Sequence, residues 1–100
     1  MGANLDSLAA LYLRRDIKSR AGWLAFLKVG KMVESDPEQA WHFILHALSR
    51  AKNDEEIAYV AAGALEDFLR LHGLAFTDRV DEVWRRDEKM RCAISCVWLS

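Results

Sequence analysis

The sequence has few residues that interrupt helices. It contains a single proline and five glycines among 100 residues, which leaves little room for long loops. Hydrophobic residues make up 52% of the chain, far more than in a disordered protein. At this length we expect one helical domain with one core, spanning residues 1–100.

The sequence is also poor in cysteine. Cys92 and Cys96 lie four residues apart in a segment with helical character. That spacing places both on one helix face but is poor geometry for a disulfide, and no second pair is present to complete a zinc site. We therefore expect two reduced cysteines that act as small, mostly buried apolar groups.

No apolar run approaches the roughly 20 residues that a membrane-spanning helix needs. The first apolar stretch, residues 5–13, is interrupted by Asp6 and Ser7 and follows no basic segment, so it does not resemble a signal peptide. The start Met1-Gly2 is that of a myristoylation signal, but Asp6 stands where that signal needs serine or threonine. We expect a cytoplasmic protein that does not bind membranes.

The chain has almost no net charge. Its formal charge of −1 produces no overall field that would attract nucleic acid. Residues 1–31 nevertheless contain six basic residues: Arg14, Arg15, Lys18, Arg20, Lys28 and Lys31. Because these alternate with apolar residues, the pattern favours packing of the basic segment near the acidic middle of the chain over a nucleic-acid-binding surface.

Helical periodicity runs through nearly the whole chain, and no segment sustains period-two alternation. The pattern predicts an all-α fold of about five to six short, antiparallel helices. The expected helices cover about residues 5–15, 18–34, 35–51, 53–72, 74–86 and 87–99. The last two are either separate helices or one bent helix.

The sequence marks several helix ends. For helix 35–51 it allows two starts: Ser35 and Glu38 have the spacing of a capping box, or Asp36 caps the helix and Pro37 takes its first position. Three further end signals are the N-cap candidates Asn4 and Asn53 and the C′ candidate Gly73.

Two helices have informative apolar faces. Helix 53–72 is apolar around most of its circumference, so we expect it at the centre of the fold. Gly63 within it costs helix stability, which predicts that another helix approaches closely there. Helix 18–34 has an apolar stripe expected to face the core: Trp23, Phe26, Leu27, Gly30 and Val33.

Short connections place successive helices roughly antiparallel. Two architectures fit this pattern, a compact irregular bundle or a HEAT-like stack of α-hairpins. In both, residues 1–30 form basic N-terminal helices and residues 35–99 form a helical-hairpin core.

One helix side has the residue types of a metal site. Glu38, His42 and His46 follow one another at four-residue spacing along helix 35–51. Two imidazoles one turn apart, with a carboxylate one turn earlier, can bind a transition metal. Because no cysteine-rich segment completes such a shell, a solvated helix side is favoured over a metal site.

Two adjacent acids, Glu66 and Asp67, interrupt the apolar helix 53–72. Neighbouring residues on a helix point about 100° apart, so the pair does not form one catalytic site unaided. We expect Glu66 to pair with Arg70 one turn later, and Asp67 to pair with a base from the N-terminal third.

The aromatic residues are the best candidates for partner binding. Trp23, Trp41, Trp84 and Trp98 all fall on apolar helix faces, where burial in the core is the usual outcome. In so small a chain we expect some aromatic side chains to remain exposed at the surface. The candidates for contact with a partner are Tyr12, Trp23 and Trp98.

Three segments resemble a family of small, all-helical bacterial proteins of unknown function. They are residues 36–45 (DPEQAWHFIL), 61–69 (AAGALEDFL) and 97–99 (VWL). The resemblance covers about residues 33–99 and leaves out residues 1–30. It implies an all-α fold and a bacterial origin. It implies no activity, so it transfers no site residue.

No phosphate-binding loop, nucleophile elbow, zincin motif or EF-hand loop is present in the sequence. We therefore expect a non-enzymatic interaction or accessory protein, such as an immunity-type protein that sequesters a partner, without a cofactor. An exposed apolar patch would be covered by a protein partner or by weak homodimer formation. The alternative is a small metal-binding or regulatory domain that uses Glu38, His42 and His46.

Overall fold

The computed structural model describes the backbone of residues 2–99 and the side chains of residues 5–97. All regular elements in this part of the chain are helical: α1 (Gly2–Leu13), α2 (Arg20–Ser35), α3 (Pro37–Arg50), α4 (Asp54–Val60), η1 (Ala61–Leu65), α5 (Glu66–His72), α6 (Thr77–Arg86) and α7 (Glu88–Leu99). Because α4, the π-helical η1 and α5 keep helical backbone angles throughout, residues 54–72 form one helix. The expected all-α fold is confirmed, with six helices in the described range.

α6 and α7 are separate helices. Asp87 between them has extended backbone angles (φ −125°, ψ 111°), and its carboxylate accepts a hydrogen bond from Lys89 N at 2.9 Å. No helix among the residues described is both long and apolar enough to cross a membrane.

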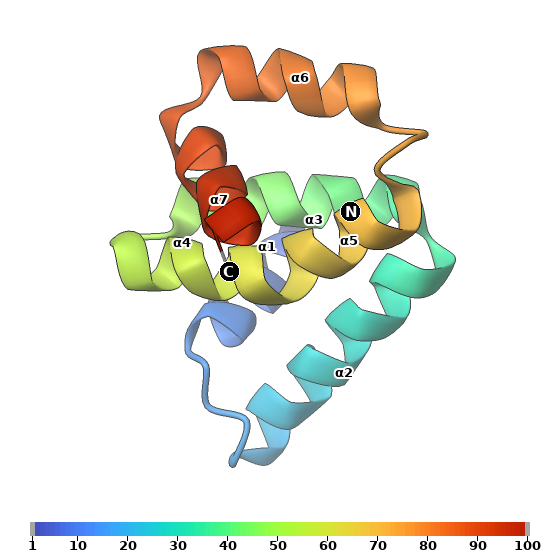
Figure 1. Cartoon of the computed structure of the whole chain (residues 1–100). Helices are drawn as coiled ribbons and strands as arrows, with labels where there is room; N and C mark the ends of the chain where they lie inside the picture. Colours follow the sequence, from blue (N-terminus) through green and yellow to red (C-terminus); the bar gives the residue numbers. More distant parts are fainter. Residues whose placement is uncertain (1, 100) are drawn as a thin grey trace.

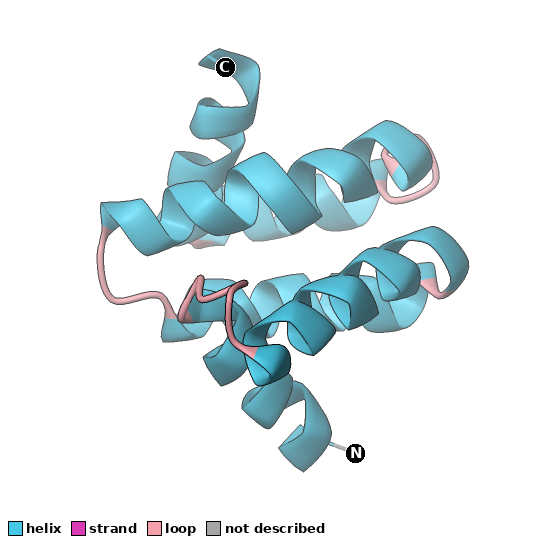
Figure 2. Cartoon of the chain, turned by 90° about the horizontal axis from the view of Figure 1, so that it is seen from below, coloured by secondary structure: helices cyan, strands magenta, loops and turns pink. Residues whose placement is uncertain are grey.

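α3 and the 54–72 helix form the middle of the fold. Figure 1 shows them side by side and antiparallel, with α2 along the lower edge and α6 at the top. α7 is seen nearly end-on in Figure 1 and from the side in Figure 2, where it runs upright to the C-terminus, so it crosses them steeply. The radius of gyration is 12.5 Å, close to the value of about 13 Å for a 100-residue domain. The architecture is a compact, irregular bundle.

Of the two possible starts for α3, the structure has the one at Asp36. The Asp36 carboxylate accepts a hydrogen bond from Gln39 N at 3.3 Å, and Pro37 occupies the first helical position. Ser35 instead ends α2 and donates its hydroxyl to Lys31 O at 2.8 Å. The expected cap at Asn53 is confirmed, since its side chain accepts from Glu56 N at 2.9 Å.

Two expected helix-end signals were wrong. Asn4 is not an N-cap, because α1 begins at Gly2 and Asn4 lies inside it. Gly73 is not a left-handed C′ residue, because its φ of −55° and ψ of −40° are right-handed helical values. The chain continues there through one further turn, in which Phe76 N donates to His72 O, and α6 starts only at Thr77.

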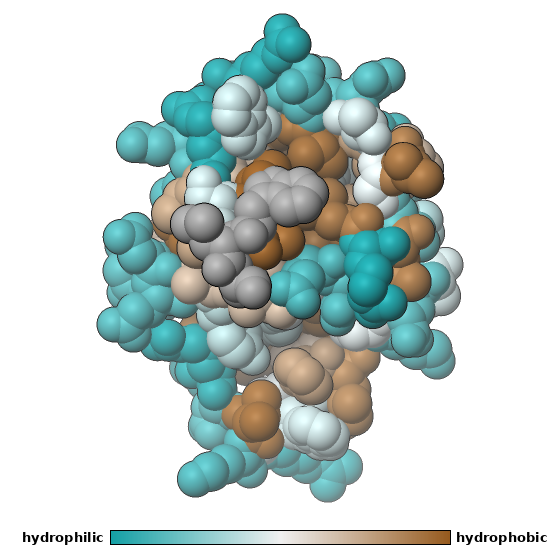
Figure 3. Space-filling model, in the orientation of Figure 1, coloured by the Kyte–Doolittle hydropathy of each residue, from teal (hydrophilic) through white to brown (hydrophobic). Residues whose placement is uncertain are grey.

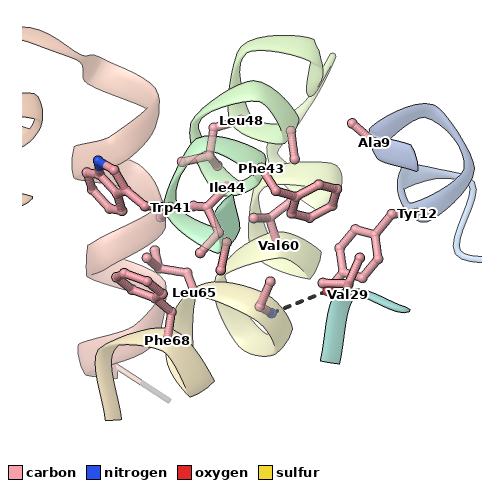
Figure 4. Close-up of a cluster of buried hydrophobic side chains, with 14 of the residues drawn as sticks. Ala9, Tyr12, Val29, Trp41, Phe43, Ile44, Leu48, Val60, Leu65 and Phe68 are labelled. Carbon is pink, nitrogen blue, oxygen red and sulfur yellow. Dashed lines mark hydrogen bonds between the residues drawn. The ribbon is translucent and has the colours of Figure 1, made fainter. Parts of the chain in front are cut away.

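The 54–72 helix lies at the centre, as its apolar circumference predicts. It packs against α1, α2, α3 and α7. Val60, Leu65 and Phe68 are fully buried on it, and Phe43 and Ile44 are fully buried on α3. Figure 4 shows these side chains pointing toward one another between the two helices.

Candidate functional site

The three residues of the candidate metal site lie on α3 and have separate surroundings. The Glu38 carboxylate pairs with Arg79 of α6 at 2.8 Å. His46 Nε2 lies 2.8 Å from Asp6 Oδ1 of α1, and Arg50 Nη1 contacts the same oxygen at 2.7 Å. His42 between them is exposed. This side of α3 is therefore used for polar contacts with two other helices.

Both carboxylates are stabilised in their ionised form. The hydrogen bond from His46 is the main cause that lowers the pKa of Asp6, and the hydrogen bond from Arg79 is the main cause that lowers the pKa of Glu38. Because each pKa is lower in the folded state, the stabilisation is present above the unfolded-state pKa. It is lost as the pH falls through the folded-state value.

No group of three or more His, Cys, Asp or Glu side chains within the described residues is arranged to hold a metal ion. We predict that calorimetric titration with zinc gives no stoichiometric heat at micromolar concentration, because Glu38 and His46 would have to leave Arg79 and Asp6. Stoichiometric heat that disappears in a His42→Ala, His46→Ala variant would contradict this prediction and assign a metal site.

The paired acids of the 54–72 helix do not have their expected partners. Arg70 Nη2 lies 3.3 Å from Asp67 Oδ1, a pair three residues apart on the same helix. The expected pairs of Glu66 with Arg70, and of Asp67 with a base from the N-terminal third, were both wrong. A base of the N-terminal third, Arg15, pairs instead with Glu55, at 3.5 Å.

The two cysteines are free thiols on α7. Both are half-buried, somewhat less than expected. Burial is the main cause that raises the pKa of Cys92, and the neighbouring Cys96 raises it further. A raised pKa favours the protonated thiol, whereas a reactive cysteine needs a lowered one.

Tyr12 was expected at the surface and is instead in the core, with 4% of its area exposed. Its ring lies between Phe43 and Tyr59, at centroid distances of 5.5 and 5.0 Å. Its hydroxyl accepts a hydrogen bond from Ala64 N at 3.3 Å (Figure 4). Burial raises the pKa of this phenol strongly. The side chain is buried because its one polar atom has a partner inside.

Gly63 was expected to allow another helix to approach closely, and the group that approaches it is the side chain of this same tyrosine. A Cβ atom added to Gly63 would lie 2.6 Å from Tyr12 Oη. The glycine therefore makes space for a side chain of α1.

Trp23 is exposed, with 44% of its area accessible, which agrees with its choice as a candidate for partner contact but not with its place on a stripe expected to face the core. Its ring stacks on Phe26 of the same helix, at 5.6 Å between centroids and 19° between planes. Trp84 is equally exposed, whereas Trp41 is buried. The side chain of Trp98 lies outside the described residues.

Most of the α2 stripe that was expected to face the core instead faces away from it. Trp23, Phe26 and Leu27 are 40–47% exposed, and a Cβ added to Gly30 would have no atom within 4 Å. We call Trp23, Phe26, Leu27 and Gly30 the outer seam. Only Val33 of the predicted stripe is buried.

The face of α2 that packs on the core is made of smaller residues. Its buried members are Gly22, Ala25, Val29, Met32 and Val33. These positions also have helical spacing, so α2 has two apolar faces. The spacing of the smaller residues is the sequence signal from which the buried face could have been predicted. Small side chains let the helix lie close to its neighbours, and the bulky set is left outside.

A groove of about 810 Å³ runs beside the outer seam, between α2 and the 54–72 helix. Phe26, Leu27 and Gly30 line it from α2, and Gly63 and Leu71 line it from the other side. Leu71 is 45% exposed. Figure 3 shows hydrophobic residues at the surface over α2, among hydrophilic ones. The seam and the groove together form a surface with apolar residues at its centre and with Lys31, Glu34, Asp67 and Arg70 among the groove's lining residues.

The family model for a family of unknown function, DUF6869, matches residues 14–100. The chain belongs to this family. No curated protein and no solved structure gave a match.

The DUF6869 match extends further than the resemblance seen in the sequence, which began at about residue 33. It includes α2, so both faces of that helix lie within the matched region, as do all the residues that line the groove except Tyr12. The match leaves out the whole of α1 (Gly2–Leu13), which nevertheless supplies Asp6 and Tyr12 to contacts with α3 and the 54–72 helix.

Proposed function

We propose that this protein is a non-enzymatic interaction module that binds a partner protein through the outer seam. The observation that supports this most directly is the exposure of three large apolar side chains on one side of a single helix. Trp23 is 44% exposed, Phe26 40% and Leu27 47%. Phe26 and Leu27 line one groove with Leu71, and Trp23 stacks on Phe26 beside it, so these apolar side chains are neighbours rather than scattered.

Physical reasons favour contact with a protein. Fully burying a large apolar side chain contributes about 1.5–3 kcal/mol, and about half of that contribution is still available at each of these positions. Contiguous apolar patches of this kind on small proteins are commonly interaction sites. Tryptophan is also enriched among the residues that dominate binding energy.

The seam has polar neighbours that suit an interface rim. Arg20, Lys31 and Glu34 of α2 are exposed beside it, and none of the three forms an ion pair within the described part of the chain. Apolar centres with charged rims are typical of protein interfaces.

A cytoplasmic location and a bacterial origin stay predictions.

Capture from a lysate of the source organism tests the proposal when it is done with a matched pair of variants. The immobilised wild-type protein is expected to retain a protein that the Leu27→Glu variant does not retain. Leu74→Glu is the control, because it makes the same chemical change at a leucine that is 98% exposed and outside the seam. Both sites are exposed, so the free energy of unfolding of each variant should lie within about 0.5 kcal/mol of the wild-type value.

Two results would contradict the proposal. One is that the Leu27→Glu variant retains the same proteins as wild type. The other is that Leu74→Glu abolishes retention as fully as Leu27→Glu. Quantitative mass spectrometry of the three eluates distinguishes these cases.

A further inference from the structure

We propose that the outer seam is covered by a second copy of this chain, with the two α2 helices antiparallel and related by a two-fold axis near Leu27. This inference rests on the proposed function and specifies its partner. It follows from the order of charges along α2.

Arg20, Leu27 and Glu34 are seven residues apart, so they lie along one edge of α2. The edge is about 21 Å long, at about 1.5 Å per residue. It has a base at its first position, an exposed leucine in the middle and an acid at its last. Both charges are exposed.

An antiparallel pair matches this edge to itself. When two α2 helices meet about Leu27, Arg20 of each copy faces Glu34 of the other, and the two Leu27 side chains meet at the axis. A parallel pair would place arginine against arginine and glutamate against glutamate, which is unfavourable. A two-fold interface is formed by the same patch on both copies, so the patch has to be self-complementary.

Shape agrees with charge in this arrangement. Gly30 leaves open space beside the stacked rings of Trp23 and Phe26. In the antiparallel pair, Gly30 of each copy lies within one turn of Trp23 and Phe26 of the other copy, so a ring of one chain can rest over the glycine of the other. Figure 1 shows α2 along an edge of the fold, where a second α2 can approach it.

Sedimentation velocity over about 5–500 µM tests self-association, a range that covers weak, transient interfaces. We expect the sedimentation coefficient of wild type to rise with concentration toward that of a dimer. Leu27→Glu should weaken association by at least about tenfold, because two glutamates would meet at the axis. Leu74→Glu should associate as wild type does.

Charge reversal tests the antiparallel orientation. Arg20→Glu alone or Glu34→Arg alone should weaken association by about tenfold, because each creates two like-charge contacts per dimer. An equimolar mixture of these two single variants should associate as well as wild type, because every contact between unlike chains again joins opposite charges. Lys28→Glu is the control, since Lys28 lies on another side of α2, and it should leave association unchanged.

Three outcomes would overturn the inference. A wild-type protein that stays monomeric at about 500 µM would exclude the second copy; seam-dependent capture of a different protein would still support the proposed function. Dimers that form without rescue in the mixture would exclude the antiparallel pair. Monomers that bind phosphatidylglycerol vesicles through the seam, and lose that binding in Leu27→Glu, would assign the seam to a membrane surface instead.

Discussion

Replacing Phe68 with alanine is expected to lower the free energy of unfolding by about 3–5 kcal/mol. Phe68 is fully buried on the central helix. Its ring stacks on Trp41 of α3 at 5.6 Å and meets Phe76 edge-on at 4.9 Å. Removing it would leave a cavity that two other rigid rings cannot fill by a small movement.

Chemical denaturation of Phe68→Ala and wild type measures this loss. Small domains are stable by about 5–15 kcal/mol, so the variant should be marginally folded at room temperature. Leu74→Ala is a suitable control, because its side chain is 98% exposed and the substitution should change stability by no more than about 0.5 kcal/mol. A loss below about 1 kcal/mol for Phe68→Ala would show that these rings are not the rigid centre of the core.

Replacing Gly63 with leucine is expected to destabilise the protein by about 3 kcal/mol through overpacking. A Cβ atom alone would stand 2.6 Å from the Tyr12 hydroxyl. That hydroxyl cannot move away cheaply, because the ring is held between Phe43 and Tyr59 and accepts a hydrogen bond from Ala64 N. Thermal denaturation would show the loss, and an unchanged melting temperature would contradict it.

A double-mutant cycle identifies the cause. Tyr12→Phe removes the atom that Gly63→Ala would meet, at a cost of about 1 kcal/mol for the lost hydrogen bond. In that background Gly63→Ala should be less destabilising than in wild type, by about 1 kcal/mol or more. The gain in helix propensity from glycine to alanine occurs in both backgrounds and cancels. Additive costs would show that Tyr12 is not the group that requires glycine.

The start of α3 shows how far local chemistry could be predicted. A helix cap depends only on residues within about three positions of it. The helix starts expected from Asp36, Pro37 and Asn53 are therefore present. The sequence left the choice between Ser35 and Asp36 open. That choice depends on where α2 ends, because Ser35 is still helical and its hydroxyl bonds to Lys31 O.

The candidate site was predicted less well, and Tyr12 and α2 show why. A period of three to four residues indicates that a helix has an apolar face, but α2 has two such faces. Likewise, the apolar position of Tyr12 does not say whether its hydroxyl finds a partner. The partner is Ala64 N, 52 residues away in the chain.

The sequence by itself determined the helices, because propensity, capping and periodicity act over a few residues and agree along nearly the whole chain. It also determined which helix is central, since the 54–72 helix is apolar around most of its circumference. Only the tertiary structure decided which face of α2 is buried and which aromatic residues are exposed. Those outcomes depend on contacts between residues that are far apart in the sequence, such as the hydrogen bond from Ala64 N to the Tyr12 hydroxyl, which lies beside Gly63.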